Sequence, residues 1–207
     1  LSEILHTIAQ ALMIPCLIIL LVLMAGAVWQ IGDIVVEYIA ERRKHKCNVP
    51  QLLRDVHAAG ADGLAELIEN SGLLRRQKKA LLELAESRGL PKDTLTALAE
   101  RLLATEEARN ARTTSITDMI AKLGPMFGLL GTLIPLGPGI VALGQGDTVT
   151  LSESMNVAFD TTIAGVISAA VASVISHIRK RWYNDDMVSL ETLMEAVLEE
   201  VTSDVEG

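Results

Sequence analysis

Three long apolar stretches divide the chain. Residues 4–32 and 123–146 contain no Asp, Glu, Lys or Arg, and residues 154–178 contain only Asp160. A membrane helix needs ~20 mostly apolar residues to cross ~30 Å of hydrocarbon, and each stretch is long enough. The pattern therefore predicts an all-α membrane protein with three transmembrane helices.

The breaks in this pattern predict the organisation of the chain. No Gly or Pro occurs between Pro91 and Gly124, so the helix before the second span is expected to continue into it, and the third span to continue past Arg181. We expect Pro15 to kink the first span. The expected segments are residues 1–40 as transmembrane helix 1, 41–115 as a helical cytoplasmic domain, 116–146 as transmembrane helix 2, 150–178 as transmembrane helix 3, and 179–207 as an acidic cytoplasmic C-terminal helix.

The first span is predicted to be retained. Ala25-Gly26-Ala27 resembles a signal-peptide cleavage site, but the preceding segment carries Glu3 and no Lys or Arg, and its apolar run is longer than that of a signal peptide.

Basic residues next to the spans predict the orientation, since Lys and Arg concentrate on the cytoplasmic side of a membrane. Residues 1–7 and the loop 144–152 contain none. The N-terminus is therefore expected outside and the C-terminus in the cytoplasm. The basic residues that carry this expectation are Arg42, Arg43, Lys44 and Lys46 after the first span, Arg109, Arg112 and Lys122 before the second, and Arg179, Lys180 and Arg181 after the third.

Charge and composition exclude several function classes. The net charge is −8, and residues 182–207 carry eight acids without a Lys or Arg, so the chain has no basic platform for nucleic acid. Cys16 and Cys47 lie at different expected depths, and the four histidines are scattered. The sequence shows no nucleophile–base motif, phosphate-binding loop or metal-ligand spacing. We therefore expect no enzyme, cofactor or metal site.

Two polar features leave alternatives open. Asp33 and Glu37 share a helix face near the cytoplasmic end of the first span. They mark either a hydrated helix end or a contact with a basic cytoplasmic segment. The apolar stripe of residues 187–201 either packs within the protein or joins a bundle of several subunits around a cytoplasmic vestibule.

Small residues in the second and third spans predict close helix packing. They recur at steps of three or four, which places them on one face of each helix. Small faces let membrane helices approach closely, and this explanation requires no ion. The residues are Gly124, Gly128 and Gly131 in the second span, and Ala158, Thr162, Gly165, Ala169, Ala172 and Ser176 in the third.

Pro135 and Pro138 predict a helix break in the second span. Proline removes one helical hydrogen bond and leaves the carbonyl four residues earlier, at Gly131 and Ile134, without its usual donor. Such carbonyls must face protein or water in a membrane. The consequence is either a plain kink or a polar spot beside Thr132.

Asp160 is the one ionisable residue deep in the third span. Intramembrane acids are costly and usually functional. Asp160 lies ~200° around the helix from Thr162. We expect it to contact the proline-containing part of the second span and to tune ion access, or else to be an interfacial carboxylate.

The arrangement of spans resembles that of the MotA/TolQ/ExbB family of ion-channel subunits. Gly128-Leu129-Leu130-Gly131-Thr132 is similar to the family's second-span motif, and residues 158–165, with Thr162 three before Gly165, resemble its third-span motif. Span number and length are closest to the TolQ/ExbB branch.

The resemblance implies a proton channel subunit of a membrane motor in the cytoplasmic (inner) membrane. It implies a homo-oligomer of five copies in the lipid bilayer, surrounding single-span partner helices of the ExbD/TolR/MotB type. Thr132 and Thr162 would then face the ion path, and we include Thr161 and Asp160 as candidates.

The sequence departs from the family pattern at two positions. Pro135 stands where relatives often have glycine, and Val157 stands where TolQ and ExbB proteins carry a glutamate. Asp160 lies about one turn later. A non-conducting membrane scaffold remains the alternative function, while three spans without inverted repeats argue against a solute transporter.

Overall fold

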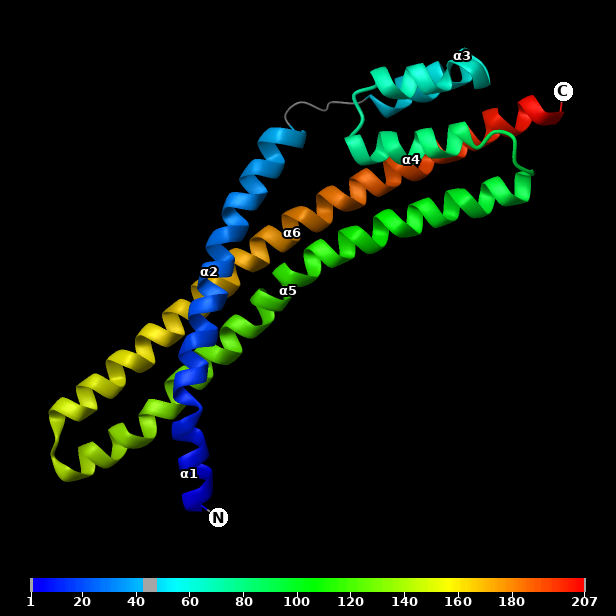
Figure 1. The fold of residues 1–207 in the computed structure, drawn as a ribbon. Coiled ribbons are helices and arrows are strands. Elements are labelled where there is room, and N and C mark those ends of the chain that lie inside the picture. Colours follow the sequence, from blue (N-terminus) through cyan, green and yellow to red (C-terminus); the bar gives the residue numbers. More distant parts are fainter. Residues whose placement is uncertain (1, 43–47, 207) are drawn as a thin grey trace. The chain divides into compact units, whose positions relative to one another are not determined.

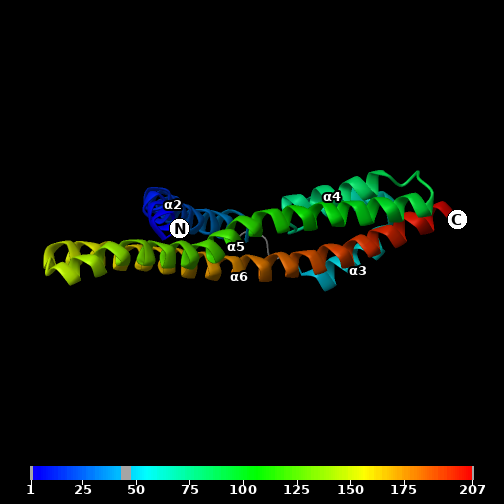
Figure 2. The same ribbon diagram turned by 90° about the horizontal axis from the view of Figure 1, so that it is seen from below.

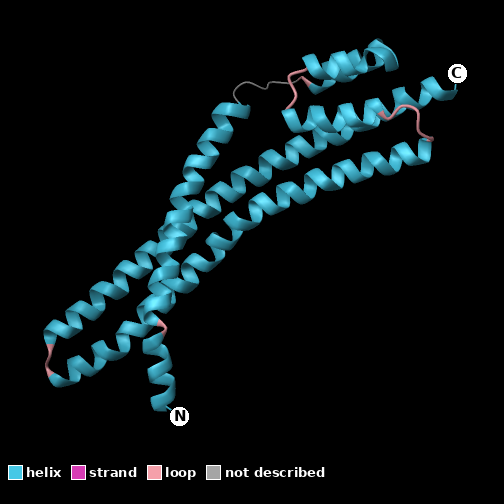
Figure 3. Ribbon diagram, in the orientation of Figure 1, coloured by secondary structure: helices cyan, strands magenta, loops and turns pink. Residues whose placement is uncertain are grey.

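The structure, a computed structural model, describes residues 2–42 and 48–206. These residues are almost entirely helical, joined by short loops, and contain no strand, which confirms the predicted all-α class (Figure 3). Arg43, Lys44, Lys46 and Cys47, which entered the arguments on orientation and disulfides, lie outside the described residues. The helices are α1 (Ser2–Ala11), α2 (Met13–Glu37), a π-helix (Tyr38–Arg42), α3 (Val49–Asn70), α4 (Arg75–Glu86), α5 (Lys92–Gln145) and α6 (Thr148–Glu206).

Three helices are long and apolar enough to cross a membrane, which confirms the number of spans. They are Met13–Ala40, Lys92–Gln145 and Thr148–Ser203. The second and third continue far beyond their apolar parts, as expected from the absence of Gly and Pro between Pro91 and Gly124.

The prolines of the first and second spans have different effects on their helices. At the N-terminus the helix is interrupted at Leu12. Pro15 lacks the N–H that would bond to the Ala11 carbonyl, so the interruption has a direct cause. By contrast, α5 continues as one helix through Pro125, Pro135 and Pro138. The prolines of the second span therefore do not interrupt the helix as predicted, although each of them lacks the backbone N–H that would donate a helical hydrogen bond.

The chain divides into two compact units. We call residues 1–34 and 114–178 the membrane unit, and residues 35–113 and 179–207 the second unit. In the membrane unit, α5 and α6 form an antiparallel pair joined by a tight turn at Gly146 and Asp147 (Figure 1). Gly146 adopts φ = 75°, a conformation that favours glycine.

The second unit has its own hydrophobic core, to which α3, α4, α5 and α6 all contribute. Leu84, Leu95, Leu193, Val197 and Val201 are fully buried in it. The stripe of residues 187–201 thus packs within the protein, one of its two predicted alternatives. Residues 179–207, which were predicted as an acidic C-terminal helix, belong to the same compact unit as residues 35–113.

Candidate functional site

Glycines bring α5 and α6 into close contact in the membrane unit. A Cβ atom added at Gly165 would lie 2.5 Å from the carbonyl oxygen of Gly124 and 2.8 Å from Cα of Gly128. A Cβ at Gly124 would lie 3.0 Å from Cβ of Ala169. Only glycine fits such a backbone approach, so these residues set the distance between the two helices.

Thr161 lies inside the same contact. A Cβ at Gly131 would come within 2.6 Å of Cβ of Thr161, whose side chain is buried. The Thr161 hydroxyl is 2.9 Å from both the Val157 and Ala158 carbonyl oxygens and donates to its own helix. In this chain, Thr161 therefore fills the α5–α6 contact.

The α2 helix packs on one side of the α5–α6 pair (Figure 2). Cys16 and Leu20 of α2 contact Phe127 and Leu130 of α5, and the Cys16 thiol lies 3.4 Å from the Phe127 carbonyl. Nearer the other end of α2, the buried residues Leu23, Ala27, Ile120 and Ala172 form one cluster. Of the other small residues of α6, Ala158 and Ala169 are also buried.

Thr132 and Thr162 lie on the other side of the pair. Each follows by one residue, or about 100°, a position in the α5–α6 contact, namely Gly131 and Thr161. Because the helices run antiparallel, the same rotation along each chain brings both threonines to one side. The α5 positions that contact α2, Phe127 and Leu130, precede Gly128 and Gly131 and so are turned the opposite way.

Both threonines are partly exposed, and both hydroxyls are already bonded within their own helix. The Thr132 hydroxyl donates to the Leu129 carbonyl at 2.6 Å, and the Thr162 hydroxyl donates to the Ala158 carbonyl at 3.0 Å. Each oxygen keeps lone pairs that can accept a further hydrogen bond from water or a hydrated proton.

Asp160 does not lie where the sequence argument placed it. It precedes Thr161 and is turned away from α5, with an exposed side chain that forms no hydrogen bond or ion pair with a described residue. The predicted contact with the second span is therefore wrong within one chain. Thr161 is the residue of α6 that faces α5, and Asp160 lies one position before it, so its side chain is rotated by about 100° from this contact.

Sequence reasoning missed a polar contact between α5 and α6. The Ser176 hydroxyl lies 2.5 Å from a carboxylate oxygen of Asp118, and Ser176 is buried. Two other polar atoms of this unit, Oε1 of Gln30 and Oγ1 of Thr117, are buried without a hydrogen-bond partner in the described part of the chain. Asp118 lies four residues before Lys122, within the residues predicted as the second span, and an acid at that position is the one signal in the sequence that could have pointed to this contact.

In the second unit, Glu37 contacts a basic residue, the second of the two alternatives for the Asp33–Glu37 face. The Arg179 guanidinium donates from Nε to Oε2 of Glu37 at 3.0 Å, and both side chains are largely buried. Tyr183 lies beside this pair. Burial, followed by the negative charge of Glu37, raises the pKa of Tyr183 to about 12. Tyr38 stacks on Trp182 next to it.

Asp147 caps α6 at the turn between the two long helices. Its carboxylate accepts hydrogen bonds from the backbone N–H groups of Val149 and Thr150 and from the Thr150 hydroxyl. The bond from this hydroxyl is the largest cause that lowers the pKa of Asp147. Among the described residues, no group of three or more His, Cys, Asp or Glu side chains is placed to hold a metal ion.

Comparison with known proteins identifies the family of the chain. A comparison with curated proteins finds no match. The family model of the MotA/TolQ/ExbB proton channel family matches residues 66–192, which include the glycine contact of α5 with α6 and both threonines. That match covers more than half of the chain, and the all-helical fold and its three apolar helices agree with it. The chain is a membrane protein that belongs to the MotA/TolQ/ExbB proton channel family.

Proposed function

We propose that this protein is the ring-forming subunit of a proton-driven membrane motor. Several copies, five by the family resemblance, surround single-span partner helices in the cytoplasmic membrane, with the N-terminus outside. The work available is ~2.3 kcal/mol per charge for each 100 mV of membrane potential. In this proposal the chain is not an enzyme and needs no cofactor.

The position of Thr132 and Thr162 carries the proposal. The two hydroxyls lie on the same side of the α5–α6 pair, and the contacts of α2 are on the other side. A ring that turns this side inward presents hydroxyls from two helices of every copy to its centre. Thr161 then supports the path from within the helix contact and does not line it.

Asp160 has a separate place in the proposal. A carboxylate at membrane depth must be neutral, paired, hydrogen-bonded or reached by water. Since Asp160 has no partner among the described residues, its partner belongs to another chain or is water. We propose that it tunes ion access at the boundary between neighbouring copies.

A non-conducting scaffold is the second candidate, and a specific observation favours it. The hydroxyls of Thr132, Thr161 and Thr162 all donate to carbonyls of their own helices, and the glycines serve close packing. Such a role requires no ion path.

The substitution Thr162→Val separates these two functions. It keeps the volume of the side chain and removes the hydroxyl, so we expect normal assembly and about a tenfold lower proton flux, since one hydrogen bond to a charged group contributes ~1.5 kcal/mol or more. The measurement is acidification of vesicles that contain the full complex, under an imposed membrane potential. Thr132→Val should give a smaller loss, because the neighbouring Gly131 carbonyl remains.

The matched control is Thr192→Val on the same helix. The Thr192 hydroxyl also donates to a carbonyl four residues earlier, that of Val188, but it lies in the second unit. Equal flux in the Thr162→Val variant, the control and the wild type would support the scaffold.

A further inference from the structure

A basic groove lies on the second unit between α4 and α5. Its volume is roughly 900 Å³. Five basic and two acidic side chains, Glu83 and Glu106, line it, which leaves an excess of three positive charges. The basic residues are Arg76 and Lys79 of α4, and Arg101, Arg109 and Arg112 of α5.

Most of this positive charge has no ion-pair partner among the described residues. Arg109 lies 3.4 Å from Glu106. The other four basic side chains are exposed, and none of them forms an ion pair with a described residue. Like charges in one groove repel each other, and a chain with a net charge of −8 has ample acid to neutralise them.

A complementary acidic ridge lies on α6 of the same unit. Glu191, Glu195 and Glu199 follow one another at intervals of four residues, so they share one helix face over about 12 Å. All three are exposed and form no ion pair with a described residue. Intervening residues such as Leu193 and Val197 are buried in the core, which fixes the direction of the ridge.

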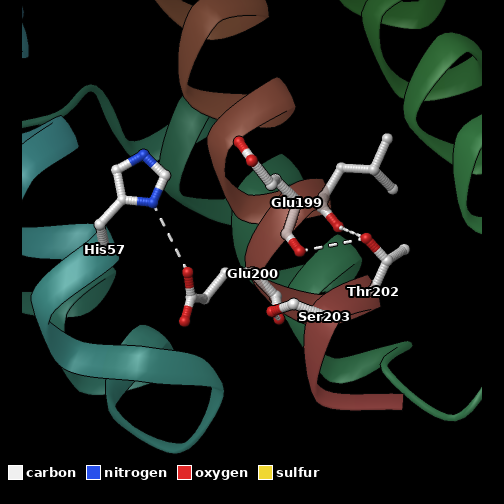
Figure 4. Close-up of polar contacts among 6 residues, drawn as sticks. His57, Glu199, Glu200, Thr202 and Ser203 are labelled. Carbon is white, nitrogen blue, oxygen red and sulfur yellow. Dashed lines mark hydrogen bonds and ion pairs between the residues drawn. The ribbon is translucent and has the colours of Figure 1, made fainter. Parts of the chain in front are cut away.

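Glu200 does not belong to the ridge. Its Oε2 lies 3.6 Å from Nδ1 of His57, on α3. Figure 4 shows the Glu200 side chain reaching toward His57, with no interaction drawn between His57 and Glu199. The ridge thus consists of Glu191, Glu195 and Glu199, three exposed glutamates on one helix face that form no ion pair with a described residue.

We propose that the basic groove of one copy binds the acidic ridge of α6 from a second copy. The two surfaces are complementary, they belong to one compact unit, and their charges do not pair within it. From Arg101 to Arg112 the groove extends about 16 Å along α5, enough for the ridge. Charge complementarity of this kind sets register and partner choice.

The two surfaces are different patches of one chain, and this determines the type of assembly. A contact between different patches is heterologous, and when repeated it closes into a ring if the rotation between copies allows. The inference rests on the proposed function only in assuming that copies form a ring. It does not depend on ion conduction.

Charge reversal with rescue tests the contact in the full chain. Lys79→Glu with Arg101→Glu reverses the groove, and Glu191→Lys with Glu195→Lys reverses the ridge. We expect each pair to lower the oligomeric fraction about tenfold at roughly 0.15 M salt, and the combination of all four to restore it. Native mass spectrometry of the solubilised protein measures the fraction, and far-UV circular dichroism shows that each variant is folded.

The control variant Glu66→Lys with Glu107→Lys raises the net charge by the same amount as the ridge reversal, at exposed sites outside both surfaces. It should leave the oligomer unchanged. A disulfide should form between a copy carrying Arg101→Cys and a copy carrying Glu195→Cys, each with its two native cysteines replaced by serine, since neither copy alone provides both thiols.

Several results overturn the inference. One is an oligomer that resists both reversals, and another is a four-residue variant that folds but does not reassemble. Absence of the disulfide is a third, and loss of bound anionic lipid from the groove variants alone, with no change in the oligomer, is a fourth. A monomeric wild-type chain would contradict the proposed ring itself. A ring that is insensitive to the charge reversals would contradict only the contact between the groove and the ridge.

Discussion

At the scale of single residues, the most demanding environment is that of Arg179. Its side chain is 3% exposed, and Glu37 beside it is 16% exposed. A buried charge is tolerated only when it is paired and hydrogen-bonded, and removing one partner leaves the other as an unpaired buried charge. Tyr183 adds its hydroxyl to this pair, so three side chains from α2 and α6 depend on one another.

Tyr183 predicts a dependence of stability on alkaline pH. Its pKa of about 12 in the folded protein lies above the ordinary value of about 10. The neutral phenol is therefore favoured by folding. The contribution of the neutral phenol to the unfolding free energy is complete below pH 10 and is lost as the pH rises toward 12. We expect the wild type to exceed Tyr183→Phe in unfolding free energy by about 1–2 kcal/mol at neutral pH.

The measurement is chemical unfolding of both proteins from pH 8 to pH 12. The difference between them should shrink over the upper two pH units. It should also be smaller in a Glu37→Gln background, which removes the negative charge that favours the neutral phenol. A constant difference across this range would show that Tyr183 contributes only by packing.

At the scale of helices, the glycine contact between α5 and α6 determines how closely they approach. Gly165→Ala places a methyl group 2.5 Å from the Gly124 carbonyl oxygen, against backbone that cannot give way. We expect a loss of about 1–3 kcal/mol in stability, as for other overpacked contacts. Thermal unfolding of the membrane-inserted or detergent-solubilised protein measures it.

Gly144→Ala is the matched control on α5. No atom lies within 4 Å of its added Cβ. Alanine favours helix over glycine by about 0.5–1 kcal/mol, so this change should raise the unfolding temperature. If both substitutions shift the temperature in the same direction, the close approach is not what Gly165 provides.

The sequence was sufficient to predict most of the helical architecture. Charge-free stretches identify the three apolar helices, and the absence of Gly and Pro after Pro91 anticipates the length of α5. The small residues predicted to mediate close packing include glycines that do lie between α5 and α6. These features follow from local composition and periodicity, which a sequence displays directly.

What the sequence could not supply was the direction of individual side chains. Spacing alone placed Asp160 nearly opposite Thr162 and gave no face to Thr161, but the contact with Gly131 shows that Thr161 faces α5 and Asp160 does not. The Asp118–Ser176 and Glu37–Arg179 contacts join residues far apart in the chain. Their pairing depends on which helices pack together, and periodicity within one helix carries no such information.

At the scale of the whole chain, two hydrophobic interiors stabilise two units. Leu193, Val197 and Val201 of α6 are fully buried in the core of the second unit, along with residues of α3, α4 and α5. The membrane unit depends instead on small-residue contacts and two minor clusters. A defect in one core should therefore loosen one unit.

Leu193→Ala tests this division. It should cost about 2–5 kcal/mol, because a fully buried side chain leaves a cavity. Hydrogen exchange should accelerate in α3, α4 and residues 92–113 of α5, and remain slow in residues 114–145. Val188→Ala, at an exposed position of the same helix, should change little. Equal acceleration in both units would mean that they unfold as one.

The turn at Gly146 and Asp147 limits how this end of the helix pair can be closed. Two residues, one with φ = 75° and one capping α6, span the whole connection. A connection of this length is too short to fold over an opening or to move away from one. Any plug, latch or receptor for an external ligand at this end must come from some other segment or from another polypeptide.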